Sequence, residues 1–201
     1  MFKKFHPLVL ILVIGVLIIS GVFVYLKNSK PASNGVVNPE DHIKGDPAAP
    51  ITILVFSDFQ CPFCGNYHKT LQQALDNYPG KVRLLFKHFP LTGHLQARPA
   101  AEASECAAEQ GKFWEFADGL FSNQEKLGGS LYQELASNLG LNLSQFNECI
   151  SSRKYKDKVE ANYQEGLAKK FKGTPASFIN GQEVSGAVPY EKIKSIIDSL
   201  L

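Results

Sequence analysis

The chain has 201 residues and 44% of them are hydrophobic, which suits one domain with its own core and a short extra segment. The first 30 positions hold four lysines and no acidic residue, so residues 31–201 keep 17 basic and 19 acidic side chains and a net charge of −2. Such a near-neutral domain lacks the basic surface that nucleic-acid binding requires, and we expect no nucleic-acid partner.

The first predicted element is a membrane span. Residues 8–26 carry no charge, and 19 helical residues nearly cross a hydrocarbon core, which takes about 20. We therefore expect residues 1–27 to form an N-terminal membrane anchor. A cleaved signal sequence is the alternative, but its apolar region is about 7–15 residues long and ends at a small-residue cleavage site, which is not visible here. The four cysteines favour an oxidising compartment, so we place the catalytic part on the extracytoplasmic side of the cell membrane.

A tether and then an alternation of strand and helix follow the anchor. Residues 28–41 are rich in Asn, Ser and Pro without apolar periodicity, which is typical of a linker. The nearly continuous apolar run 51–56 predicts a buried strand, 62–78 an amphipathic helix and 82–86 a second strand. Because a strand–helix–strand order needs a crossover, it favours a parallel pair of strands.

The second half of the chain is mostly helical and ends in a hairpin and a helix. Asn180-Gly181 predicts a tight turn between strands at 176–179 and 182–184. We expect Ser144 to cap one of the helices. The predicted helices lie at residues 97–110, 113–126, 131–139, 144–151, 155–172 and 190–200. The fold class is therefore α/β, with a helical insertion between two halves of a small sheet.

The residues with the clearest chemistry are Cys61 and Cys64, at the junction of the first strand and the first helix. Pro62 suits the first helical position, which places Cys61 at the cap, where unpaired N–H groups and the helix dipole stabilise a thiolate. We therefore predict that Cys61 is an exposed nucleophile and Cys64 the buried resolving cysteine. A redox-inert staple is one alternative. A metal site is another, with His68 as a third ligand, but the chain has no second paired-cysteine motif.

Several segments resemble the DsbA-like family of thiol:disulfide oxidoreductases. The similarity covers about residues 42–201, and it is specific because separate segments agree in order. The matching segments are residues 57–64 (SDFQCPFC), 82–91 (VRLLFKHFPL), 100–116 (AAEASECAAEQGKFWEF), 173–178 (GTPASF) and 186–189 (GAVP).

The resemblance implies a thioredoxin-like fold for residues 42–201, with the helical insertion at about residues 95–172. It also implies thiol–disulfide exchange through Cys61 and Cys64, with no bound cofactor and no metal. Pro62 and Phe63 then belong to the active-site loop. Thr174 and Pro175 match the loop that faces the cysteines, in which the proline peptide bond is cis and the backbone pairs with an extended substrate.

Two positions depart from the family pattern. Phe63 stands where the best-known members have histidine, and Val55 stands where many thioredoxin-fold enzymes keep a buried acid as a proton relay. His68 is a candidate relay, because the intrinsic pKa of histidine is near neutral. A solvated helix histidine is the alternative reading of His68.

Cys106 and Cys149, 43 positions apart in the insertion, are the remaining cysteines. In an exported domain we expect a structural disulfide between them, worth about 4 kcal/mol in the chain-entropy model. Two buried free thiols or a second redox pair are the alternatives.

The expected activity is that of a protein disulfide oxidase acting on unfolded or reduced exported proteins. The resemblance implies a membrane-bound, quinone-linked protein as the reoxidant. A reductase or isomerase is the first alternative, although no dimerisation segment is visible and we expect a monomer. A non-enzymatic metal carrier or peptide-binding chaperone is the second.

Overall fold

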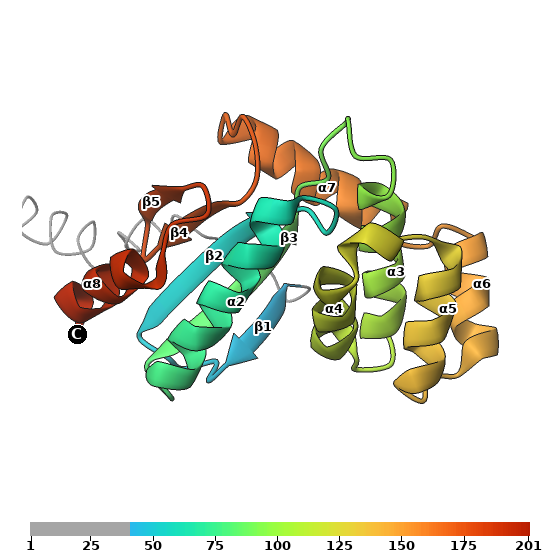
Figure 1. Ribbon diagram of the computed structural model, residues 1–201, viewed down its shortest axis with the longest axis horizontal. Coiled ribbons are helices and arrows are strands. Elements are labelled where there is room, and N and C mark those ends of the chain that lie inside the picture. Colours follow the sequence, from blue (N-terminus) through green and yellow to red (C-terminus); the bar gives the residue numbers. More distant parts are fainter. Residues whose placement is uncertain (1–40) are drawn as a thin grey trace, which may run out of the picture. The chain divides into compact units, whose positions relative to one another are not determined.

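The computed structural model describes residues 41–201 (Figure 1). The predicted anchor at residues 1–27 and nearly all of the tether lie outside the described residues. Within residues 41–201, every helix is too short or too polar to cross a bilayer. The predicted α/β fold with a helical insertion is present in this part of the chain.

A five-stranded sheet forms the centre of the domain, in the order β1-β3-β2-β4-β5. The strands are β1 (His42–Gly45), β2 (Ile51–Ser57), β3 (Val82–His88), β4 (Ala176–Ile179) and β5 (Gln182–Ser185). As predicted, β2 and β3 are parallel, with Ile51 opposite Val82 and Ser57 opposite His88. The other pairs are antiparallel, including the β4–β5 hairpin. Its turn residues Asn180 and Gly181 both have positive φ, as a tight hairpin turn demands.

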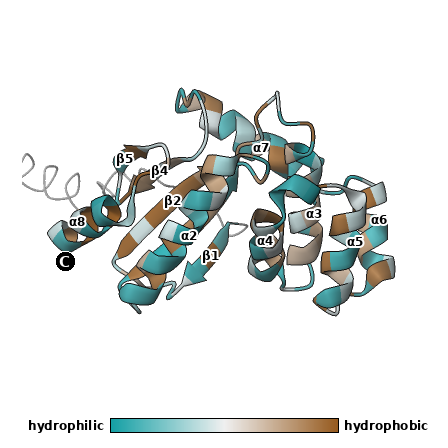
Figure 2. Cartoon of the chain, in the orientation of Figure 1, coloured by the Kyte–Doolittle hydropathy of each residue, from teal (hydrophilic) through white to brown (hydrophobic). Residues whose placement is uncertain are grey.

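Both faces of the sheet are covered, which explains why β2 is apolar without alternation (Figure 2). Ile53 and Val55 point into the larger core beneath α2 (Pro62–Asn77) and α8 (Tyr190–Leu200). Leu54 and Phe56 point into a smaller core, where Tyr163 of α7 (Lys156–Ala168) packs. The carboxyl end of β2 is thereby fixed from both sides, directly before the cysteines.

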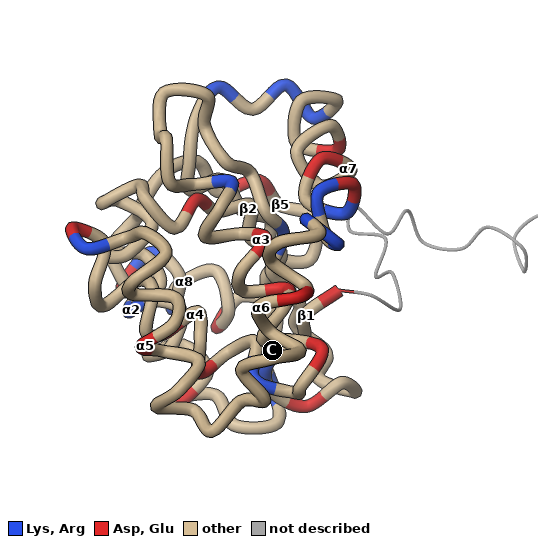
Figure 3. Tube along the Cα trace, turned by 90° about the vertical axis from the view of Figure 1, so that its right-hand side faces the viewer, with Lys and Arg blue, Asp and Glu red and all other residues tan. Residues whose placement is uncertain are grey.

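The insertion is a bundle of helices that lies beside β1 in Figure 1. Trp114 links it to that edge strand, because its indole Nε1–H donates to the carbonyl of Ile43 at 3.0 Å. Besides α7, the bundle contains α3 (Ala97–Ala108), α4 (Phe113–Ser122), the 3-10 turn η1 (Gln124–Lys126), α5 (Gly129–Asn138) and α6 (Leu143–Ser151). Acidic and basic residues are interspersed along α7 (Figure 3), so this helix presents no surface of one charge.

Two local expectations are wrong. The cap of α6 is Asn142 rather than Ser144, because the Asn142 side chain accepts the backbone N–H of Gln145 at 3.1 Å. The helix predicted for residues 155–172 ends at Ala168. Lys170 adopts a φ of 63°, and the chain then turns so that Phe171 packs against Phe56 of the sheet.

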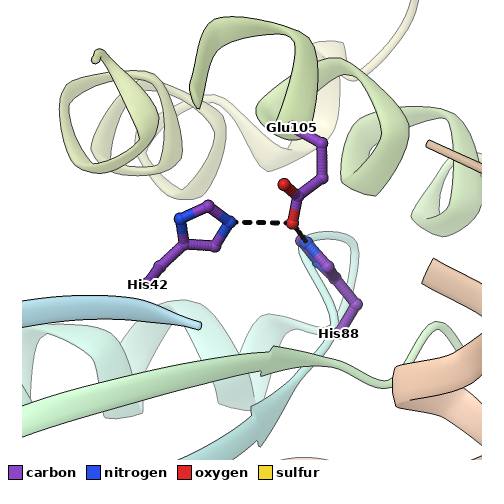
Figure 4. Close-up of side chains that lie close together, drawn as sticks. All are labelled: His42, His88 and Glu105. Carbon is purple, nitrogen blue, oxygen red and sulfur yellow. Dashed lines mark hydrogen bonds and ion pairs between the residues drawn. The ribbon is translucent and has the colours of Figure 1, made fainter. Parts of the chain in front are cut away.

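The insertion is also joined to the sheet by a buried charged cluster, shown in Figure 4. Glu105 of α3 is almost fully buried, and its Oε1 accepts Nε2–H groups from His42 of β1 and His88 of β3, both at 2.8 Å. Its other oxygen binds the ammonium of Lys158 in α7 at 2.7 Å. Burial alone would raise the pKa of Glu105, but the hydrogen bonds from the two histidines outweigh it and hold the pKa well below the usual range. The carboxylate is therefore ionised at neutral pH.

Replacing Glu105 with glutamine should destabilise the domain by about 3 kcal/mol, because it leaves the Lys158 charge without its buried counter-ion. The measurement is urea unfolding followed by circular dichroism. Glu115→Gln is the matched control, since Glu115 pairs with Lys112 on the surface and should cost less than about 1 kcal/mol. Equal effects of the two substitutions would show that the cluster does not hold the insertion to the sheet.

Candidate active site

The two cysteines lie where β2 passes through a short turn into α2. Cys61 is the N-cap of α2 and Pro62 its first helical residue, as predicted. The turn is fixed by the backbone N–H of Cys61, which donates to the carbonyl of Asp58 at 3.1 Å. The expectation that Cys61 is exposed is wrong: its exposed fraction is 4%, against 1% for Cys64. The exposed residues of the motif are Pro62 and Phe63, and Phe63 has an exposed fraction of 66%.

The pKa values of the two thiols are shifted in opposite directions. The pKa of Cys61 is lowered from its usual value near 9 to about 5, chiefly by a hydrogen bond from the Cys64 thiol. Contacts with Thr174 and the backbone amides of Cys64 and Phe63 lower it further. Burial raises the pKa of Cys64, and the neighbouring Cys61 raises it again. At neutral pH the reduced site therefore holds a thiolate at Cys61 and a thiol at Cys64.

This ranking of causes differs from the one expected from the sequence, which attributed the thiolate to the start of the helix. Cys64→Ala should therefore raise the pKa of Cys61 well above about 5, because the largest stabilising hydrogen bond is lost. Cys64→Ser keeps a donor at that position and should raise it less. Thiolate absorbance at 240 nm against pH measures both. An equal pKa of Cys61 in the two variants would assign the effect to the helix amides instead.

The Thr174-Pro175 loop faces Cys61 from the start of β4. Its peptide bond is cis. The Cys61 Sγ lies 3.5 Å from the carbonyl oxygen of Thr174, to which the protonated thiol donates. β4 then pairs antiparallel with β2, so the loop and the cysteines are held at the same end of the sheet. An extended segment added beside Thr174 would bring its own sulfur close to Cys61.

His68 faces away from this arrangement. Its Nε2 lies 2.6 Å from Asp118 Oδ1 in α4, and its ring stacks on Phe121. It lines a groove of about 560 Å³ between α2 and α4 together with Asp118 and Phe121. Among the described residues, the structure gives His68 no hydrogen bond to either cysteine. The arrangement therefore supports neither a relay to Cys64 nor a metal site built from the cysteine pair and His68.

Two residues that the sequence pattern does not single out hold the cysteine turn. Asp58 is buried, and its carboxylate accepts the backbone N–H of Gln60 at 2.7 Å and His94 Nδ1–H at 2.7 Å. Its own backbone N–H lies 3.5 Å from Cys64 Sγ. Gln124 of η1 contacts the turn from the insertion. An acidic residue just after a buried strand is a recognisable signal for Asp58, but no local pattern points to Gln124.

Cys106 and Cys149 form a disulfide that ties α3 to α6. Both sulfurs lie inside the insertion, in the main hydrophobic core. Cys61 and Cys64 are the cysteines with free thiols in the described part of the chain. The structure thus separates one bonded pair in the helical bundle from one reduced pair at the end of β2.

Comparisons with known proteins agree with this architecture. The family profile described as thioredoxin matches residues 37–199. The structure of α-DsbA1 from Wolbachia pipientis superposes with a TM-score of 0.74 and 26% identity, covering 84% of this chain and 95% of that one. Oxidised BdbD from Bacillus subtilis gives a TM-score of 0.72 at 22% identity, covering 80% of this chain and 92% of that chain.

Curated relatives match only in part. A protein named Na(+)/H(+) antiporter NhaA 3, from Salinispora tropica, is 34% identical over 165 residues, which is 81% of this chain and 25% of that protein. The chain thus spans about a quarter of the length of the curated relatives it matches, so their transport activity describes much longer proteins. The profile match over residues 37–199, the cysteine pair at the start of α2 and the inserted helices together show that the chain belongs to the thioredoxin family, as one of its DsbA-like thiol:disulfide oxidoreductases.

Proposed function

We propose that the chain is an extracytoplasmic disulfide oxidase that introduces disulfide bonds into reduced, exported proteins. The observation that carries this proposal is the pair of opposite acidities at Cys61 and Cys64. A stabilised Cys61 thiolate favours the reduced form of the enzyme, and an enzyme that favours its reduced form has a strongly oxidising disulfide.

The reaction follows from the geometry. In the disulfide form, a substrate thiolate attacks Cys61 Sγ beside Thr174, the Cys61–Cys64 bond breaks, and Cys64 leaves and takes up the proton that the substrate thiol lost on ionising. A second substrate thiolate then attacks the substrate sulfur of the mixed disulfide. This step expels Cys61 as a thiolate, and its low pKa makes it a good leaving group. The substrate loses two electrons, and the enzyme gains them as a thiolate and a thiol.

The pH dependence follows from the same thiolate. Because the folded pKa of Cys61 lies below its usual value near 9, the thiolate stabilises the reduced fold fully above that value and loses this effect as pH falls through about 5. The disulfide form has no such thiolate. The reduced form should therefore gain unfolding free energy relative to the disulfide form as pH rises from 5 to 9.

We further propose that residues 8–26 anchor the enzyme in the cell membrane and that the catalytic domain works as a monomer on the outer side. The Cys106–Cys149 disulfide supports an oxidising compartment, because disulfides rarely persist in the cytosol. Substrates are unfolded or reduced exported proteins. The electrons pass to a membrane-bound, quinone-linked reoxidant.

The test is the equilibrium of the Cys61–Cys64 pair with glutathione, combined with oxidative refolding of a reduced disulfide protein. A disulfide oxidase should have a potential nearer about −120 mV than about −270 mV and should speed formation of the first disulfides in the substrate. A potential near about −270 mV would make the chain a reductase instead. Stoichiometric zinc on the reduced protein, with no exchange with glutathione, would favour the metal-carrier alternative.

A further inference from the structure

The side chain of Gln124 reaches from the insertion into the turn that carries Cys61. Its Nε2 donates two hydrogen bonds, to the carbonyl oxygens of Phe59 and Cys61, both at 2.8 Å. The Cys61 carbonyl also accepts the backbone N–H groups of Cys64 at 3.0 Å and Gly65 at 3.3 Å. Gln124 therefore binds the same carbonyl oxygen at which hydrogen bonding in α2 begins.

Gly65 faces the same amide from the first turn of α2. A Cβ added to Gly65 would lie 2.4 Å from Gln124 Oε1, closer than real Cβ contacts allow, and 3.0 Å from its Cδ. Glycine weakens a helix interior relative to alanine. Its presence here has a physical reason, since any side chain would push the Gln124 amide off the two carbonyls.

We propose that Gln124 is a positioning residue for the redox pair, which holds Cys61 in the geometry that stabilises its thiolate, and that Gly65 leaves room for it. This inference rests on the proposed redox function of Cys61 and Cys64. Gln124 begins η1, two positions after the end of α4, so the contact also joins the insertion to the backbone of Cys61.

Gln124 can affect the Cys61 thiolate because the position of the sulfur decides which hydrogen bonds it receives. To be stabilised as a thiolate, Cys61 Sγ has to lie within reach of the Cys64 thiol and of the backbone amides of Cys64 and Phe63. The N-cap of α2 has no side-chain cap of its own, so the position of Cys61 depends on its backbone contacts. Without the Gln124 amide, the Cys61 backbone loses one of three donors to its carbonyl, and the sulfur is held less closely.

The redox test compares Gln124→Ala and Gln124→Glu with the parent chain. Both should raise the pKa of Cys61, measured by thiolate absorbance, and Gln124→Glu should raise it more, because a carboxylate cannot donate and adds a negative charge near the thiolate. The equilibrium with glutathione should shift by roughly threefold or more toward a less oxidising disulfide, which corresponds to about half a pKa unit. Gln133→Ala and Gln133→Glu are the controls, since Gln133 bonds to Asn147 within the insertion, and they should change neither quantity.

A double-mutant cycle with Gly65→Ala tests the contact itself. In the parent chain, Gly65→Ala should lower the melting temperature and shift the glutathione equilibrium in the same direction as Gln124→Ala, because the methyl group displaces the amide. In the Gln124→Ala background the same change should raise the melting temperature by a few degrees, because alanine then gains helix propensity without a clash.

The outcomes separate the two proposals. If the changes in melting temperature caused by Gly65→Ala and Gln124→Ala were additive, the two residues would not be in contact. If the Gln124 variants lost stability while the pKa of Cys61 and the glutathione equilibrium stayed unchanged, Gln124 would be a structural contact alone. A parent chain that never exchanges with glutathione would overturn the proposed function instead, and the reversal of sign at Gly65 would still show whether the contact exists.

Discussion

Cys61→Ser should abolish oxidation of reduced peptides, lowering the rate at least about a thousandfold, to the uncatalysed level. A serine hydroxyl neither forms a disulfide nor ionises near neutral pH, and Cys61 supplies both properties here. Cys64→Ser should also lose turnover, but by another route. It keeps the Cys61 sulfur, which still forms mixed disulfides with protein disulfides, but the Cys61–Cys64 disulfide that oxidises a substrate cannot form.

The two variants therefore differ in a way that a gel can show. Incubation with a protein that contains a disulfide should give reducible adducts with Cys64→Ser and none with Cys61→Ser. Cys64 should not attack that disulfide, because it is 1% exposed and burial raises its pKa. Adducts that form only through Cys64 would reverse the two roles. Retained turnover in both variants would exclude a redox function for the pair.

Much of the sheet could be predicted because its signals are local. The run from Ile51 to Phe56 is apolar because both faces of β2 are buried, and Asn180-Gly181 carries the turn chemistry of a hairpin. The cysteine pair was also recognisable, since a proline at the first helical position fixes Cys61 at the cap. Each of these features depends on residues within a few positions of one another.

β1 gives no such signal. Its sequence His-Ile-Lys-Gly has one large apolar residue, and it is a strand because β3 offers it an open edge and Trp114 binds its backbone. The same holds for Gln124, which is 63 positions from Cys61 and meets it only in the folded chain. Long-range contacts of single polar side chains leave no periodicity that a sequence pattern can reveal.

The charged cluster shows a third kind of limit. Glu105 and His88 are residue types that usually lie on the surface, and a sequence pattern assigns them there. Glu105 is buried because His42, His88 and Lys158 bind its carboxylate from three other elements. His68 shows that proximity in the sequence does not fix the direction of a side chain. Its position one turn beyond Cys64 favours a role at the cysteines, but the helix directs its ring toward Asp118.

Removal of the Cys106–Cys149 disulfide should lower the free energy of unfolding by about 4 kcal/mol, because the unfolded chain regains the entropy of a closed loop of 43 positions. The change to make is the double substitution Cys106→Ala and Cys149→Ala, which leaves no unpaired thiol in the core. Denaturant unfolding without reductant, with the Cys61–Cys64 pair oxidised in both proteins, measures it, since the two proteins then differ only at positions 106 and 149.

The same variant separates a structural bond from a second redox pair. A structural disulfide predicts lower stability with an unchanged glutathione equilibrium at Cys61–Cys64, because the bonded pair ties α3 to α6 within the insertion and the reacting sulfurs lie at the end of β2. A pair that relays electrons predicts that turnover falls while the folded fraction stays high. Turnover has to be measured at a temperature at which the parent and the double variant both remain folded, so that a loss of turnover cannot come from unfolding. Full turnover by the double variant would show that the Cys106–Cys149 disulfide is structural and holds α3 and α6 together in an oxidising compartment.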